Sequence, residues 1–185
     1  MKRRMAPVLC LLLLFALGCA ERPSPAQSDV PAAELPSFAA GPMTDYDVKV
    51  GDLDFDTVTL DGRAIRAGVI REYDLVMVNC WADWCGPCVR ELPELERLHQ
   101  AHPNVLILGL LCNPNSTDDA KAILKDAGVT YPALMPGGSL AGLENRLAAY
   151  PTTFFFDSTG HEIADPIVGA RSYAEWNSIA EDLLP

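Results

Sequence analysis

The chain has 185 residues, 49% of them hydrophobic, which suits one domain with a sizeable core plus appendages. Its formal net charge of −11 at pH 7 argues against nucleic acid as a partner. Its six cysteines are typical of a protein from an oxidising compartment in which disulfides form and are exchanged.

The first twenty residues have the pattern of a secretion signal. A basic stretch at 2–4 precedes an apolar run at 6–17 that is too short to span a bilayer stably. Cys19 follows Leu-Gly at the end of that run, which predicts a lipoprotein signal peptide at 1–18 and lipidation of Cys19. Ordinary secretion with cleavage at a small-residue site is the alternative. Loss of 1–18 makes the chain more acidic by three charges, so membrane attachment would come from acyl chains alone.

A tether and a hairpin are expected before the main motif. Residues 19–44 are rich in Pro and Ala and have no helical or strand period, which predicts a disordered tether. The folded domain is then expected over 45–185. Its first part, 48–65, reads as strands around turns, with Asp61-Gly62 as a hairpin signal.

A strand followed by two cysteines carries the strongest chemical signal. The apolar run Leu75–Trp81 predicts a buried strand, and Cys-Gly-Pro-Cys at 85–88 stands where helix-compatible sequence begins. A helix N-terminus favours thiolate over thiol at Cys85, and Cys88 lies one turn on over the same face. Pro87 is tolerated in the first turn, where its missing N–H would have no partner. This arrangement predicts reversible disulfide exchange.

Two other interpretations of the cysteine pair are a structural disulfide and half of a zinc site. A disulfide that only stabilises the fold usually closes a longer loop, because the entropic stabilisation by a disulfide grows with loop length. A zinc site needs two further ligands at comparable spacing. The remaining candidates do not supply such a pair: His99, His102, His161, Cys80 and Cys112. Redox chemistry is therefore favoured.

The helix after the cysteines carries a candidate base. Glu91 lies three residues after Cys88, so its carboxylate can approach that sulfur. The alternative is a surface glutamate favoured near the helix N-terminus by the helix dipole. Pro93 removes the backbone bond to the carbonyl of Val89 and should kink the helix.

A second strand and helix follow. Residues 104–111 are apolar throughout and predict a buried parallel strand, and a helix is expected from near Ser116 to just before Gly128. This order predicts a right-handed βαβ crossover. Cys112 ends this strand and Cys80 lies in its expected neighbour. They are either a second disulfide or two buried free thiols, and the free thiols are favoured.

The rest of the chain alternates short elements. A short strand at 133 and a Gly-rich loop lead to a helical patch over 140–149. A strand that starts at Pro151 is followed by a turn and a returning strand over 162–168. The closing helix, 172–184, is expected to be core packing and not a site, with these residues on one face: Tyr173, Trp176, Ile179, Ala180 and Leu183.

The segment 81–88, Trp-Ala-Asp-Trp-Cys-Gly-Pro-Cys, with Pro93 after it, resembles a thioredoxin-fold active site. Asn79 and the segment 150–153, Tyr-Pro-Thr-Thr, resemble more specifically the TlpA/ResA family of extracytoplasmic thiol-disulfide oxidoreductases. The resemblance runs from about residue 45 to the C-terminus and is specific at these two motifs. It implies an α/β thioredoxin fold, a central mixed β-sheet flanked by helices, with an N-terminal β-hairpin.

The resemblance also implies a substrate-docking surface. In the thioredoxin fold the proline that matches Pro151 is cis and lies against the two cysteines, and the residue before it, here Tyr150, offers backbone bonds to an incoming peptide. Many relatives have a smaller aliphatic residue at that position, so a tyrosine changes the groove. Trp84, Gly86 and Pro87 are expected to complete the surface.

Two further positions take their meaning from the resemblance. Thioredoxin-like sequences place a buried carboxylate where this chain has Asn79, and an amide cannot act as a base. Asn79 is therefore either a tuning residue that orients a thiol or a water, or an ordinary hydrogen-bonded strand residue. Glu91 matches an active-site glutamate of the ResA-type branch.

The function that the resemblance implies is reduction of protein disulfides outside the cytoplasm, with apocytochrome c thiols as an analogy for the substrate. Cys85 would attack and Cys88 would resolve. Protein thiols and disulfides, and a membrane electron donor of the thiol-disulfide relay type, are the expected partners. No metal or organic cofactor is expected, because the cysteines carry the electrons. The alternatives are a disulfide oxidant or isomerase, and a non-catalytic metal-binding module.

Overall fold

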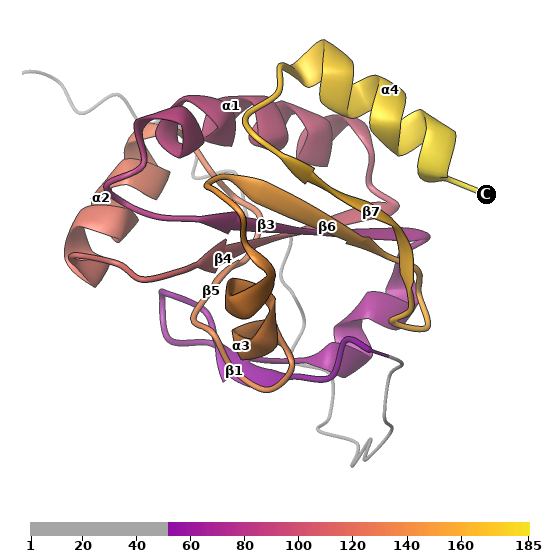
Figure 1. Ribbon diagram of the computed structural model, residues 1–185, viewed down its shortest axis with the longest axis horizontal. Helices are drawn as coiled ribbons and strands as arrows, with labels where there is room; N and C mark the ends of the chain where they lie inside the picture. The colour runs from indigo at the N-terminus through magenta and orange to yellow at the C-terminus, as the bar shows by residue number, and fades with distance from the viewer. Residues whose placement is uncertain (1–51) are drawn as a thin grey trace, which may run out of the picture. The chain divides into compact units, whose positions relative to one another are not determined.

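The computed structural model describes residues 52–185 (Figure 1). The predicted signal peptide at 1–18, the lipidated Cys19 and the tether at 19–44 lie outside the described residues. Within residues 52–185, no helix combines the length and the apolar character that a membrane crossing requires.

A five-stranded mixed sheet forms the centre of the fold. Its strand order is β5–β4–β3–β6–β7, in which β3, β4 and β5 are parallel and β6 and β7 run antiparallel to their neighbours. The strands are β3 (Leu75–Trp81), β4 (Val105–Leu111), β5 (Ala133–Leu134), β6 (Thr152–Phe156) and β7 (Glu162–Val168). The main helices are α1 (Gly86–Ala101), α2 (Thr117–Asp126), α3 (Leu140–Leu143) and α4 (Tyr173–Leu183). The predicted thioredoxin fold is confirmed.

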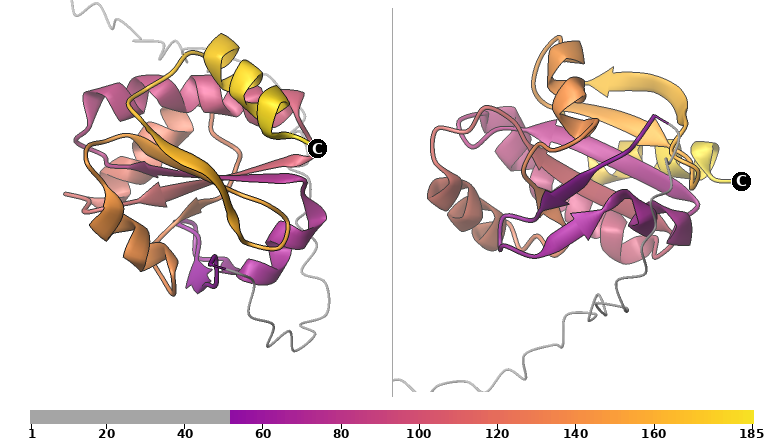
Figure 2. Two further views of the ribbon diagram at one scale, coloured as in Figure 1. Left: turned by 45° about the vertical axis from the view of Figure 1, so that its right-hand side comes forward. Right: turned by 90° about the horizontal axis from the view of Figure 1, so that it is seen from below.

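Both faces of the sheet are covered, which explains the continuous apolar runs of its central strands. Every residue of β3 and β4 is buried. Figure 1 shows α1 and α4 on one side of the sheet and α3 and β1 on the other, and Figure 2 shows the same layers from two further directions. Alternate residues of β3 therefore enter two separate core layers: Met77 and Trp81 pack toward α1 and α4, whereas Val76 and Val78 pack on the opposite face. Asn79 lies on the α1 side, where it is the buried polar residue of the strand.

The N-terminal hairpin is present as two short strands. Strand β1 (Asp56–Val58) pairs antiparallel with β2 (Ala64–Arg66) across the Asp61-Gly62 turn. Gly62 has a φ of +88°, a backbone conformation that glycine adopts without strain. A 3₁₀ helix that the sequence pattern did not predict, Ala67–Glu72, then leads to β3.

The helix predicted over 140–149 is shorter than expected. Helix α3 ends at Leu143 and one 3₁₀ turn follows, Glu144–Arg146. The backbone is extended at Leu147, which ends the helical stretch. The Ala149 carbonyl accepts a hydrogen bond from the hydroxyl of Thr152 and not from a helical N–H. The chain needs these residues to reach the sheet and begin β6.

Candidate active site

The two cysteines lie at the junction of β3 and α1. Cys85 is the N-cap of α1, its Sγ accepts a hydrogen bond from the backbone N–H of Cys88 at 3.2 Å, and a disulfide joins the two residues. Cys85 is 6% exposed and Cys88 is 1% exposed, so Cys85 is the more accessible residue of the pair. In the reduced protein, the unpaired N–H groups and the dipole at this helix end favour a thiolate at Cys85.

An aromatic pair stands beside Cys85. The Trp84 side chain is 48% exposed, and its ring meets the ring of Tyr150 edge-on, with 5.4 Å between centroids. The Tyr150–Pro151 peptide bond is cis, as the family resemblance implies. The Trp84 indole N–H donates to the carbonyl of Asn113 at 2.9 Å, which fixes the ring orientation.

The loop after β4 is bound to the cysteine motif by a carboxylate. The two oxygens of Asp83 accept the backbone N–H groups of Asn115 and Ser116 at 2.9 and 3.0 Å. Ser116 in turn caps α2, where its hydroxyl accepts the N–H of Asp119. One side chain from the motif thus positions a neighbouring loop next to Trp84.

Glu91 lies buried beneath α1 and is 2% exposed. Its Oε1 accepts the backbone N–H of Arg171 at 2.8 Å and the indole N–H of Trp176 at 3.0 Å, and its Oε2 accepts the amide N–H of Asn79 at 3.1 Å. Burial raises the pKa of the Glu91 carboxyl, and these three hydrogen bonds only partly oppose that effect. The surface-glutamate interpretation is wrong, because this carboxyl is enclosed by the core.

Asn79 and Glu91 meet in space. The Asn79 amide donates to Glu91 and, through its second N–H, to the hydroxyl of Thr153 at 2.9 Å. Both N–H bonds of the amide are thus used, and one of them holds the carboxylate. An amide NH₂ group donates and a carboxylate accepts, so the direction of the hydrogen bond between Asn79 and Glu91 is determined by their chemistry.

The closing helix packs in the core, as predicted, and in addition it contacts the Glu91 carboxyl. Trp176 of α4 is fully buried, and its indole N–H donates to the Glu91 carboxylate. The backbone of Arg171, just before that helix, contributes a second bond. Sequence reasoning missed both residues. A signal was available for the tryptophan, because a buried indole N–H usually has an acceptor.

The other two cysteines of the folded part are free and fully buried, in agreement with the favoured interpretation. The neighbouring Cys80 thiol, followed by burial, raises the pKa of the Cys112 thiol. His161 is held in the turn between β6 and β7, where its ring contacts the Thr159 hydroxyl at 2.8 Å. In the stretch from 52 to 185, no group of three or more His, Cys, Asp and Glu residues is arranged to hold a metal ion.

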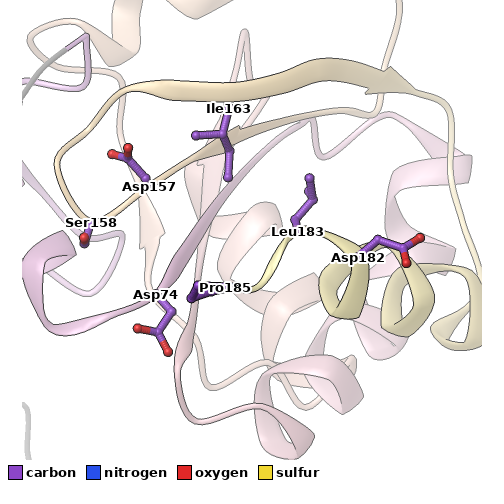
Figure 3. A pocket seen from close by; sticks show the side chains of 7 residues that line it. All are labelled: Asp74, Asp157, Ser158, Ile163, Asp182, Leu183 and Pro185. Atoms are coloured by element: carbon purple, nitrogen blue, oxygen red, sulfur yellow. The ribbon is translucent and has the colours of Figure 1, made fainter.

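Figure 3 shows an open pocket of about 440 Å³ that has no cysteine in its lining. Its lining residues come from just before β3, the β6–β7 turn, the first part of β7 and the end of α4 with the residues after it: Asp74, Asp157, Ser158, Ile163, Asp182, Leu183 and Pro185. Asp74 precedes β3 and Cys85 follows it, so about seven residues of extended strand, roughly 23 Å, separate the two regions. This pocket does not belong to the candidate active site.

A strand, a Cys-Gly-Pro-Cys turn at a helix N-terminus, a cis-proline loop and a buried carboxyl under the helix together define a dithiol oxidoreductase of the thioredoxin fold. The comparisons with known proteins agree. The AhpC/TSA family matches residues 46–161, more than half of the chain, so the chain belongs to that family.

Similar proteins of known name indicate more closely which kind of oxidoreductase this is. The chain is 31% identical over 147 residues to the thiol:disulfide interchange protein HelX of Rhodobacter capsulatus, a match that covers 77% of this chain and 69% of HelX. It is 28% identical over 103 residues to the thioredoxin-like protein YneN of Bacillus subtilis, covering 54% of this chain and 59% of YneN. A crystal structure of a thiol:disulfide interchange protein from Chlorobium tepidum is similar with a TM-score of 0.63 at 26% identity, covering 75% of this chain and 99% of that one. The protein is therefore a TlpA/ResA-like thiol-disulfide oxidoreductase of the thioredoxin superfamily.

Proposed function

We propose that this protein reduces protein disulfides outside the cytoplasm, with Cys85 as the nucleophile and Cys88 as the resolving cysteine. The observation that carries the proposal is the position of the two sulfurs. Cys85 caps the N-terminus of α1 and is the more exposed residue, whereas Cys88 is more deeply buried and donates its backbone N–H to the Cys85 sulfur.

The reaction consists of two thiol-disulfide exchanges. The Cys85 thiolate attacks one sulfur of the substrate disulfide, a mixed disulfide forms, and the other substrate sulfur leaves as a thiolate. The Cys88 thiolate then attacks the Cys85 sulfur, which forms the Cys85–Cys88 disulfide and releases the second substrate thiolate. Two electrons pass to the substrate, and the two protons of the dithiol go to the released thiolates or to solvent. A membrane electron donor of the thiol-disulfide relay type would then return the pair to the dithiol.

Glu91 is the proposed base for the second exchange. Cys88 must lose its proton before it attacks, and Glu91 lies one turn further along the same helix. Because burial raises the pKa of Glu91, its carboxylate is a stronger base than that of an exposed glutamate. Asn79 is the proposed tuning residue, since its amide holds the carboxylate in place.

The proposed docking surface consists of Trp84, Gly86, Pro87, Tyr150 and Pro151. The exposed Trp84 ring and the Tyr150 ring provide an aromatic surface next to Cys85. Aromatic surfaces of this kind bind polypeptides well because they bury large area at little conformational cost. The backbone of Tyr150 would pair with the peptide that carries the disulfide.

The direction and the location of the reaction are part of the proposal. The Gly-Pro pair between the cysteines is that of thioredoxin, a reducing couple near about −270 mV. Residues 1–18 would be a lipoprotein signal, a lipidated Cys19 would anchor the chain, and 19–44 would tether the domain at 45–185. Preparation of apocytochrome c thiols for haem attachment and general envelope redox balance are the candidate pathways. The name of HelX, an interchange protein, supports protein disulfides as substrates.

The decisive experiment measures the reduction potential of the Cys85–Cys88 couple in glutathione buffers, together with insulin-disulfide reduction. A potential near or below about −250 mV supports the reductase, whereas a potential of about −120 to −180 mV refutes it in favour of an oxidant or isomerase. Cys112→Ser is the matched control, because it removes a buried thiol outside the pair. Insulin reduction by a Cys85→Ser variant would contradict the assigned nucleophile.

A further inference from the structure

Three buried polar atoms of the described chain, residues 52–185, have no hydrogen-bond partner. They are the indole nitrogen of Trp81, the Nδ1 of His99 and the hydroxyl of Tyr131. A buried polar group without a partner costs free energy, and in proteins such groups usually bind an internal water or serve a function. These three side chains all belong to the core layer between the sheet and α1 or to the helix that covers it.

The Tyr131 ring lies over Gly109, which strand register places opposite Asn79. Gly109 of β4 is paired with Asn79 of β3, whose amide holds Glu91. A Cβ on Gly109 would come within 3.1 Å of the Tyr131 ring and 3.5 Å of the Trp81 indole nitrogen. Both rings therefore lie over the glycine, where a side chain would otherwise stand. The Trp81 indole nitrogen therefore lies close to Gly109, the register partner of Asn79, and the negative charge of Glu91 acts on the Tyr131 hydroxyl.

His99 lies next to Tyr131 and nearer the surface of the protein. Its ring meets the Tyr131 ring edge-on, with 6.0 Å between centroids, and the residue is partly exposed. It lies two turns after Glu91 on the same broad face of α1. Glu91 itself is enclosed, because its oxygens are bonded to Trp176, Arg171 and Asn79. A proton on Glu91 therefore needs a route through neighbouring polar groups.

We propose that Tyr131 and His99, with water held between them and the Trp81 N–H, form the path by which Glu91 exchanges protons with solvent. The inference rests on the proposed role of Glu91 as the base for Cys88. The Cys88 proton passes to Glu91, then through water to the Tyr131 oxygen, while the Tyr131 hydroxyl passes its own proton toward His99 Nδ1. His99 releases a proton from its other ring nitrogen to solvent. No electron moves in these steps. Glu91 and Tyr131 end in the protonation states in which they began, whereas His99 ends as its other ring tautomer and is restored by proton exchange with solvent.

The charged groups around the path favour this assignment. Burial, then the negative charges of Glu91 and Glu96, raise the pKa of Tyr131 well above its usual value, so the hydroxyl keeps a proton to pass on. Burial lowers the pKa of His99, against the opposing effect of Glu96, which leaves a neutral ring able to accept a proton. Glu96 is held by the N–H and hydroxyl of Thr130, both at 2.7 Å, and the Arg171 charge acts on Glu91.

The test measures resolution of a preformed Cys85 mixed disulfide in single turnover, as a function of pH. We expect Tyr131→Phe to slow resolution about tenfold near neutral pH, less than the ~100-fold or more typical of losing a direct general base. Its reduction potential should stay at the wild-type value. His99→Ala should show a similar loss that added imidazole restores. His102→Ala is the matched control: His102 caps the C-terminus of α1 and contacts Asn177, so the variant should resolve at the wild-type rate with no response to imidazole.

The outcomes separate this inference from the proposed function. Wild-type rates and pH profiles in both Tyr131→Phe and His99→Ala overturn the proton path while insulin reduction by the wild-type chain still supports the reductase. A slow His99→Ala variant that imidazole does not restore also overturns it, because loss of packing would then explain the defect. Absence of disulfide reduction by the wild-type chain overturns the proposed function itself.

Discussion

Replacing Glu91 with glutamine keeps the shape of the side chain but removes its ability to accept a proton. The amide oxygen can still accept the N–H groups of Arg171 and Trp176, and rotation of the Asn79 amide can accommodate the new NH₂ group. The fold should therefore persist. If Glu91 deprotonates Cys88, resolution of the mixed disulfide near neutral pH should slow about 100-fold, or about 2.7 kcal/mol of activation free energy.

The same substitution should also change how the free energy of unfolding depends on pH. Burial raises the pKa of Glu91 in the folded state above its unfolded value, so the folded protein binds this proton more tightly. The contribution of the group to the free energy of unfolding is fully present below the unfolded pKa and is lost as pH rises through the folded pKa. Wild type should therefore lose stability relative to Glu91→Gln over that window, by about 1.4 kcal/mol for each unit of pKa shift.

Stopped-flow fluorescence of the exposed Trp84 would follow resolution, and urea unfolding as a function of pH would follow stability. Glu94→Gln is the matched control. Glu94 lies on the same helix and accepts the backbone N–H of Tyr173 at 2.9 Å, but it is not buried under the cysteines. A Glu91→Gln protein with the wild-type pH–rate profile would refute the role of Glu91 as the base.

Three further substitutions test other parts of the molecule. Cys88→Ser should accumulate mixed disulfides through Cys85, visible on non-reducing gels, and failure to trap a partner would contradict the order of the two exchanges. Gly109→Ala should lower the free energy of unfolding in urea by about 1–3 kcal/mol, because the new methyl group meets the Tyr131 ring at 3.1 Å; unchanged stability would show that the ring moves freely. Trp84→Ala should raise KM for a peptide disulfide more than it lowers kcat, and an unchanged KM would remove this ring from the docking surface.

Local patterns in the sequence predicted the framework of the site. The apolar runs at Leu75–Trp81 and 104–111 predicted strands that are buried along their whole length, and the helix start at the cysteines follows from the Cys-Gly-Pro-Cys spacing. Ser116 as the start of the next helix was also predictable, since serine is a favoured N-cap. These features depend on residues within one or two turns of each other. The family resemblance added the cis peptide bond before Pro151.

Only the tertiary structure shows which groups bind the buried carboxyl of Glu91. Glu91 was a candidate base by its spacing from Cys88, but its partners Arg171 and Trp176 come from 80 and 85 positions further along the chain. Likewise, Gly109 meets Asn79 only through strand register, and the Tyr131 ring and the Trp81 indole nitrogen lie close to that glycine. No local pattern encodes such contacts, because they arise when separate elements pack against one sheet. The sequence by itself identified the cysteine pair that forms the disulfide, and the packing of distant elements determined the environment of the buried carboxyl.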